Sequence, residues 1–148
     1  MNLIRTDSSN PDFLALVKLL DAELTILDGD QHDYYHLFNQ VQGIKNVVVV
    51  YQNNEPCGCG AFKPFADNEV EIKRMFVSPE HRNKGIAAAV LKELEDWAIA
   101  LKFDGCVLET SCKLPGAIQL YKKWGYEMIP NYGQYKGVEF SVCMRKKL

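Results

Sequence analysis

The sequence predicts an α+β fold, with an α/β mixed sheet at its centre and helices on both faces of that sheet. Three strand-like runs follow one another directly in the middle of the chain, which favours antiparallel hairpins. Later strand-like runs are separated by helical patterns, and such crossings favour parallel pairing. The expected order of elements is therefore β-α-α-β-β-β-α-β-α-β-β. A chain of 148 residues suits one domain, which we expect to cover residues 1–148.

The composition is that of an ordinary globular protein, with 47% apolar and 24% charged residues. A formal net charge of -2 gives no electrostatic reason to expect nucleic acid or an anionic membrane surface as a partner. The longest apolar run, Val47 to Tyr51, is only as long as a strand. The first residues lack the apolar stretch of a signal peptide, so we expect a cytoplasmic protein that has no nucleic-acid or membrane partner.

Five cysteines are present, and their spacing does not match a structural zinc site. Cys57 and Cys59 form a C-x-C pair within an expected strand, whereas Cys106, Cys112 and Cys143 stand alone. Zinc knuckles usually pair two C-x-x-C motifs. Since cysteine also behaves as a small apolar residue, we expect core packing or plain surface thiols, and no metal.

The first part of the chain predicts one strand followed by two helices. Leu3 to Thr6 reads as a short strand. Asn10 and Pro11 form a good helix start, because the amide can cap the helix and proline suits its first position. Apolar residues then recur at helical spacing: Phe13, Leu16, Val17, Leu20 and Leu24. The Asp28-Gly29-Asp30 segment ends this helix. A shorter helical pattern follows, which carries Tyr34, Tyr35, Leu37, Phe38 and Val41.

The middle of the chain predicts three strands in succession. They are expected at Val47–Tyr51, Cys57–Phe65 and Glu69–Val77, separated by turns rich in asparagine. Ser78-Pro79-Glu80 ends the third strand, because proline cannot join a ladder of hydrogen bonds.

The last part alternates helices and strands. A long helix is expected from about Gly85 to Leu101, followed by a strand at Cys106–Glu109 and a helix at Pro115–Trp124. Two final strands are expected at Tyr126–Ile129 and Phe140–Met144. The buried face of the long helix should carry Ile86, Val90, Leu91, Leu94, Trp97, Ala98 and Leu101.

The turn between the third central strand and the long helix has the features of an anion site. The first N–H groups of a helix lack partners within the helix, and the helix dipole favours negative charge there. Arg82, Lys84 and Gly85 cluster at this turn, and no acidic side chain lies among residues 81–88. Phosphate oxygens suit such a turn, and a solvated surface loop is the alternative. The turn is neither a P-loop nor a dinucleotide fingerprint.

Two motifs resemble those of one enzyme family. Arg82-x-x-Gly85-x-Ala87, which follows an apolar strand, resembles the Q/R-x-x-G-x-G/A signature of the GNAT superfamily of N-acetyltransferases. The segment from Ala117 to Tyr126 resembles the family's A-x-x-L-Y-x-x-x-G-F/Y helix, and one long helix and one strand separate the two motifs. The resemblance covers essentially the whole chain and implies a GNAT-like acyl-CoA N-acyltransferase fold with a single N-acetyltransferase domain over residues 1–148.

The resemblance implies a reaction and a binding site for the acyl donor. The acetyl group of acetyl-CoA would pass to a primary amine, most readily that of a small molecule, by direct attack in a ternary complex. A bulged, splayed strand at Met75, Phe76 and Val77 would pair with the pantetheine arm. The backbone N–H of Met75 or Phe76 would polarise the acetyl carbonyl. The pyrophosphate would lie on the turn formed by Arg82, Asn83, Lys84, Gly85, Ile86, Ala87 and Ala88.

The resemblance also suggests two catalytic residues. Tyr121 matches the family tyrosine that donates a proton to the departing thiolate; a buried tyrosine with an incidental partner is the alternative. Glu71 matches the glutamate that serves some members as a base, and could equally be a surface strand residue paired with a lysine. One position departs from the family pattern: Leu114 stands where many members have an asparagine that contacts the pantetheine.

The acceptor is not defined by the sequence. The segment between the first two helices mixes acidic and aromatic residues, which suits a cationic amine or an exposed polar loop with core aromatics: Asp28, Asp30, His32, Asp33, Tyr34, Tyr35 and His36. The segment 130–137 is expected to form a loop over the acceptor site. A protein lysine or N-terminal acetyltransferase and a non-catalytic acyl-CoA sensor are alternative functions, and a homodimer is compatible with the resemblance.

Overall fold

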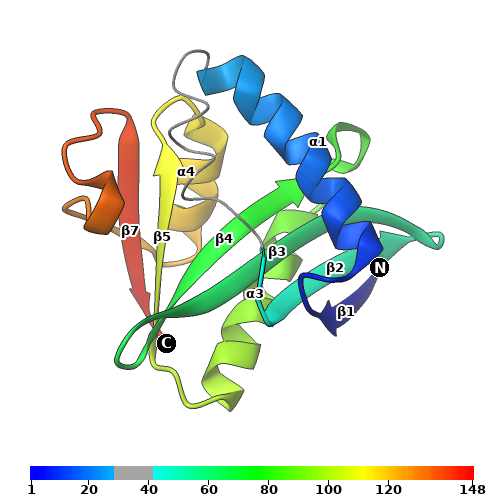
Figure 1. Ribbon diagram of the computed structural model, residues 1–148, viewed down its shortest axis with the longest axis horizontal. Helices are drawn as coiled ribbons and strands as arrows, with labels where there is room; N and C mark the ends of the chain where they lie inside the picture. The colour runs from blue at the N-terminus through cyan, green and yellow to red at the C-terminus, as the bar shows by residue number, and fades with distance from the viewer. Residues whose placement is uncertain (29–41) are drawn as a thin grey trace.

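The computed structural model describes residues 1–28 and 42–148. They form one seven-stranded sheet with the strand order β1-β2-β3-β4-β5-β7-β6 (Figure 1). Only the central pair, β4 and β5, is parallel among these neighbouring strands. The strands are β1 (Asn2–Thr6), β2 (Asn46–Gln52), β3 (Glu55–Ala66), β4 (Glu69–Val77), β5 (Gly105–Ser111), β6 (Glu127–Ile129) and β7 (Ser141–Lys147).

Helices cover both faces of the sheet, as the sequence predicts. Helix α1 (Pro11–Asp28) lies on one face, and α3 (Ile86–Ala100) and α4 (Pro115–Lys123) lie on the other (Figure 1). Short 3-10 helices at η2 (Pro79–His81) and η3 (Gly133–Tyr135) interrupt loops of the described chain. The expected cap of α1 is present, because the Asn10 side-chain oxygen accepts hydrogen bonds from the backbone N–H groups of Asp12 and Phe13 at 2.8 and 3.0 Å.

The sheet separates two hydrophobic clusters. One packs α3 and Tyr121 of α4 against the sheet and includes Phe62, Ile72 and Leu108. The other packs Phe13, Leu16 and Val17 of α1 against the opposite face. Four of the cysteines belong to the buried interior, and only Cys112 is exposed. Their thiols are free, which agrees with the expected packing role.

The predicted elements within the described residues are all present, with small shifts at their ends. The last strand begins one residue later than expected and extends to Lys147, and Gly85 caps α3 rather than belonging to it. The expected burial of Leu101 is wrong, because this residue follows the helix and is 48% exposed. Glu95 is buried instead, where Tyr126 and Lys146 each donate a 2.8 Å hydrogen bond to it. The helix expected around Tyr34–Val41 lies outside the described residues.

Strand β4 carries a bulge and then separates from β5. Cys59 is paired with Phe76 and Ala61 with Lys73, so that Gly60 of β3 lies opposite two residues, Arg74 and Met75. Arg74 has a φ of 58°, which is unusual for a residue with a side chain. The pairing of β4 with β5 ends at Ile72 and Leu108, although both strands continue. Figure 1 shows the two strands diverging from this point. The bulge and the splay implied by the family resemblance are therefore both present.

Gly60 lets helix α3 pack closely beside this bulge. A Cβ atom at Gly60 would lie 2.5 Å from Met75 Sδ, 2.7 Å from Val90 Cγ1 and 2.9 Å from Leu94 Cδ1. These distances are shorter than any normal contact between carbon or sulfur atoms. A side chain at position 60 would therefore force Met75, Val90 or Leu94 to shift.

Candidate active site

A cavity of about 150 Å³ opens where β4 and β5 separate. It is lined from both faces of the sheet, since α1 and the loop around η3 contribute from one side and α4 from the other. It contains both catalytic residues that the resemblance suggests, Glu71 and Tyr121. The remaining lining residues are Leu20, Leu24, Ile72, Lys73, Arg74, Met75, Leu108, Glu109, Thr110, Ser111, Leu114, Ala117 and Tyr135.

Tyr121 reaches the cavity from helix α4. Its side chain is buried, and its ring packs edge-on against that of Tyr126 at 5.7 Å between centroids. Burial raises the pKa of the Tyr121 phenol, and the negative charge of Glu109 raises it further. The phenol is therefore protonated at neutral pH and can act as a hydrogen-bond or proton donor.

Glu71 lies on the face of the sheet that α1 covers, and it is buried with only 3% of its surface exposed. The interpretation of Glu71 as a surface residue is therefore wrong, although the expected lysine neighbours are present. Lys73 Nζ lies 3.7 Å and Lys63 Nζ 3.9 Å from Glu71 Oε1. The hydroxyl of Tyr132 donates a 2.7 Å hydrogen bond to Glu71 Oε2. The carboxylate is thus held in one orientation at the wall of the cavity.

Two side chains beside Glu71, those of Lys73 and Tyr132, have shifted pKa values. Burial lowers the pKa of the Lys73 ammonium, and the nearby Glu71 carboxylate opposes this effect. Burial raises the pKa of the Tyr132 phenol, and the charge of Glu71 and the hydrogen bond to it act in the same direction. Tyr132 is therefore protonated at neutral pH and remains a hydrogen-bond donor to Glu71.

Sequence reasoning missed Lys73, Arg74 and Glu109 as members of this site. Glu109 is half-buried and accepts a 2.7 Å hydrogen bond from the Ser141 hydroxyl. The sequence did contain one indication for Glu109, because this residue ends the strand expected at Cys106–Glu109. Side chains at the carboxyl ends of parallel strands meet at one edge of the sheet. The segment 130–137 does lie at the cavity, as Tyr135 lines it and Tyr132 contacts Glu71.

The turn before α3 has the backbone geometry of an anion site. Gly85 caps the helix with a φ of 82°, and Asn83 has a φ of 63°. The first helical hydrogen bond runs from Ala89 N to Gly85 O at 3.1 Å. The preceding N–H groups of the helix, those of Ile86, Ala87 and Ala88, therefore have no acceptor within it. A Cβ at Gly85 would meet no atom within 4 Å, so the space beside this turn is open.

The side chains of the turn differ in how they are held. Arg82 Nε donates a 2.8 Å hydrogen bond to Val77 O, and Arg82 Nη2 contacts both carboxylate oxygens of Glu23 at 2.8 and 2.9 Å. Its guanidinium also lies 5.6 Å from the Phe76 ring centroid. Lys84 is exposed beside the open turn. The Arg82 side chain thus joins β4 to α1, and the groups left to meet an anion at this turn are mainly backbone N–H groups.

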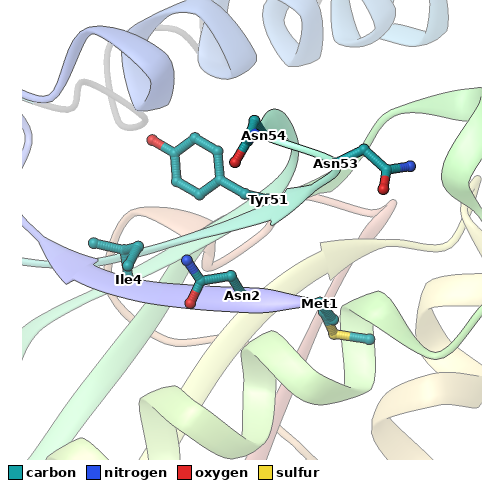
Figure 2. Close-up of a pocket in the computed structure, with 6 residues that line it drawn as sticks. All are labelled: Met1, Asn2, Ile4, Tyr51, Asn53 and Asn54. Atoms are coloured by element: carbon teal, nitrogen blue, oxygen red, sulfur yellow. The ribbon is translucent and has the colours of Figure 1, made fainter.

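A second hollow lies at the far edge of the sheet. It measures about 480 Å³ and is lined by Met1, Asn2, Ile4, Tyr51, Asn53 and Asn54. Figure 2 shows Met1, Asn2 and Ile4 along the first strand, Tyr51 on β2, and Asn53 and Asn54 in the turn after β2. None of the predicted site residues lines this hollow. The described residues that line it include no charged side chain suited to proton transfer, whereas the cavity between β4 and β5 contains Glu71 and Tyr121 and is the candidate active site.

Residues 1–28 and 42–148 contain no candidate metal site and no candidate membrane span. No cluster of three or more histidine, cysteine or acidic side chains is arranged to hold a metal ion there. No helix in the same ranges is long and apolar enough to span a bilayer.

Comparison with known proteins agrees with the geometry of the site. Residues 13–126 match the model of the acetyltransferase (GNAT) family. The match covers most of the chain, and the protein therefore belongs to the GNAT family.

Curated relatives carry N-acetyltransferase names. The chain is 43% identical over 82 residues to a probable N-acetyltransferase 14 of Xenopus tropicalis, a match that covers 55% of this chain and 40% of that protein. It is 32% identical over 100 residues to the uncharacterized N-acetyltransferase YsnE of Bacillus subtilis, covering 66% of each. It is 29% identical over 135 residues to the uncharacterized N-acetyltransferase YjgM of Escherichia coli, covering 84% of this chain and 80% of that one. The chain thus spans less than two thirds of the first two relatives.

Solved structures share the whole fold. A putative acyl-CoA N-acyltransferase from Klebsiella pneumoniae superimposes with a TM-score of 0.83 at 27% identity, covering 99% of this chain and 97% of that one. The PaiA N-acetyltransferase from Thermoplasma acidophilum, solved in complex with coenzyme A, superimposes with a TM-score of 0.72 at 17% identity over 100% of both chains. The second similarity concerns the fold alone.

Proposed function

We propose that this protein is an N-acetyltransferase that moves the acetyl group of acetyl-CoA onto the primary amine of a small molecule. The observation that carries the proposal is the cavity between the diverging strands β4 and β5. It brings Glu71 from one face of the sheet and Tyr121 from the other to a single space of about 150 Å³. Such a space suits a small amine that meets the acyl donor directly in a ternary complex.

The donor site is assigned to β4 and the turn that follows it. The open backbone N–H groups at the start of α3 suit the pyrophosphate of coenzyme A. The end of β4, which no longer pairs with β5, offers backbone groups to the pantetheine arm. The backbone N–H of Met75 or Phe76 would polarise the acetyl carbonyl. The residues assigned to the donor are Met75, Phe76, Val77, Arg82, Asn83, Lys84, Gly85, Ile86, Ala87 and Ala88.

Two side chains are assigned to proton transfer. Glu71 takes a proton from the acceptor ammonium, so that the amine nitrogen can form its bond to the acetyl carbon. The carbon–sulfur bond then breaks, and Tyr121 donates its proton to the departing sulfur. The new amide nitrogen loses its remaining extra proton to the Tyr121 phenolate, which restores the phenol. The buried position of Glu71 and the raised pKa of Tyr121 support these roles.

The experiment that tests the proposal measures release of free thiol from acetyl-CoA with pooled amines, namely amino acids, polyamines, aminoglycosides and lysine-bearing peptides. We expect release above the no-amine blank in a pool of small amines. Release only with the peptides would replace the small-molecule acceptor by a protein. Silence in every pool, from protein that still binds acetyl-CoA, would contradict the proposed transfer and favour a sensor.

A further inference from the structure

The side chain of Arg74 is buried in the candidate active site with part of its hydrogen-bonding capacity unused. It comes from the bulge of β4, and only 2% of its side-chain surface is exposed. Arg74 Nη2 donates to Asp21 Oδ1 of helix α1. Arg74 Nε is also buried, but it has no hydrogen-bond partner among residues 1–28 and 42–148. Arg74 lines the same cavity as Glu71 and Tyr121.

This arrangement is costly for a residue with only a structural role. A buried polar group that lacks a partner destabilises the folded state, and a charged group does so more strongly. The backbone of Arg74 adds strain, because its φ of 58° lies in the left-handed region. Strain and an unpaired buried donor at one cavity-lining residue indicate that a ligand completes the site.

The charges around the cavity indicate which charges this ligand carries. Asp21 pairs with Arg74 through Nη2, which leaves the Nε donor of the guanidinium for another group. Glu71 and Glu109 supply negative charge elsewhere along the wall. The cavity therefore presents carboxylates to a cation and an arginine to an anion. A molecule with both charges fits this pattern, whereas a simple amine leaves Arg74 Nε unpaired.

We propose that the acceptor carries a carboxylate close to its amine, as α-amino acids do, and that Arg74 binds this carboxylate. This inference rests on the proposed acetyl transfer, because it names the substrate class of the same site. Arg74 Nε donates to one carboxylate oxygen of the acceptor, while Glu71 faces the amine. Arginine suits the task because its guanidinium is always charged and its planar donors match a carboxylate.

The test uses acceptors that differ only by the carboxylate: leucine against isopentylamine, phenylalanine against phenethylamine, and lysine against cadaverine. For each pair, thiol release gives the ratio of kcat/KM for the amino acid to that for the amine. We expect a ratio of at least ~10 for one pair, as for a hydrogen bond to a charged group. In Arg74→Gln this ratio should fall towards one.

A matched control separates Arg74 from a general effect of arginine removal. Arg145→Gln removes another arginine that pairs with a carboxylate of β4, that of Glu69, but Arg145 does not line the cavity. Its ratio should equal that of the wild type. Wild-type ratios below one for every pair, or a high ratio that survives in Arg74→Gln, would overturn the proposal.

A binding measurement decides the same question without turnover. Calorimetry on the protein saturated with coenzyme A compares N-acetylleucine with N-isopentylacetamide, and only the first should bind measurably. If no amine gives thiol release, the proposed transfer fails. The calorimetric comparison then tests the role of Arg74 on its own. Equal binding of the two compounds would then reject carboxylate recognition.

If Arg74→Gln does not fold, Asp21→Asn provides the second variant. Removal of the Asp21 charge leaves Arg74 without its neutralising partner, so N-acetylleucine should bind ~2- to 10-fold more tightly. Binding that is unchanged or weaker would count against the proposal.

Discussion

The hydroxyl of Tyr132 donates a 2.7 Å hydrogen bond to the carboxylate of Glu71, across 61 positions of the sequence. The bond joins the loop after β6 to the central strand β4. Glu71 Oε2 accepts this hydrogen bond, while Glu71 Oε1 faces Lys63 and Lys73. Tyr132 is thus a positioning residue for the proposed base.

Replacement of Tyr132 by phenylalanine tests this role. The ring contacts with Phe65 and Tyr135 are retained, so the loop should stay in place. Loss of one hydrogen bond to a charged group should lower kcat by ~10-fold, with a smaller effect on KM. Steady-state kinetics with the best acceptor gives both values. A change in KM alone would show that Tyr132 contacts the acceptor rather than orienting Glu71.

Two carboxylates line the cavity, and one of them is assigned to proton transfer. Glu71→Gln should lower kcat/KM by ~10²-fold or more, because the amide cannot accept the proton of the acceptor. Glu109→Gln is the matched variant and should have a clearly smaller effect. Steady-state kinetics with the same acceptor measures kcat/KM for both variants. A larger loss of kcat/KM in Glu109→Gln than in Glu71→Gln would assign the role of base to Glu109.

Tyr121→Phe should lower kcat by ~10²-fold or more and change the affinity for coenzyme A by less than about twofold. The proposed donor must be protonated, so the rate should fall when rising pH ionises it. Since burial raises the pKa of Tyr121, this fall should lie above the ordinary tyrosine value of about 10. A pH profile of kcat, with calorimetry for coenzyme A, checks both points. Unchanged turnover would remove Tyr121 from the mechanism.

Gly85 and Gly116 form a matched pair for the anion site. A Cβ at either would meet no atom within 4 Å, but only Gly85 has a positive φ, at 82°. Gly85→Ala should cost ~1–2 kcal/mol of stability and weaken coenzyme A binding, because the new methyl group enters the space for the pyrophosphate. Gly116→Ala, at the start of α4, should stabilise the protein by ~0.4–1 kcal/mol. Equal coenzyme affinity in both variants would place the pyrophosphate elsewhere.

The buried tyrosines should make stability fall at high pH. Burial raises the pKa of Tyr121, Tyr126 and Tyr135 in the folded state. Above pH ~10 the unfolded chain releases these protons while the folded chain keeps them, so the unfolded state gains stability. Each such tyrosine should cost ~1.4 kcal/mol by one pH unit above its unfolded value. Chemical denaturation between pH 8 and pH 11 measures this, and Tyr121→Phe should show a shallower fall.

The sequence predicted the sheet and its helices because their signals are local. Helical spacing in residues 13–24, the Asn10 cap and the turn chemistry between strands each depend on nearby residues only. The position of the turn before α3 and the presence of Tyr121 on α4 were predicted through motifs for the same reason. The predicted burial of Leu101 was wrong because helical spacing alone does not show where a helix passes the edge of the sheet.

The missing parts of the site depend on contacts between distant segments. Nothing near Tyr132 indicates that its hydroxyl reaches Glu71, and nothing near Arg74 indicates that its neighbour is Asp21, 53 positions away. The bulge that turns Arg74 towards α1 arises from the register of β3 with β4. Register is a property of two strands together, so neither strand alone reveals it.

Gly60 determines the distance between two parts of the site without contacting either substrate position. Helix α3 begins at the anion turn and rests through Val90 and Leu94 on the strand at Gly60, opposite the bulge. A larger residue there would press on Met75, Val90 and Leu94, and a shift of α3 would carry the proposed phosphate-binding amides away from the proposed acetyl position. A screen for loss of activity would therefore identify Gly60 beside the catalytic residues. A substitution at Gly60 would thus change the distance over which the enzyme can hold the acyl donor.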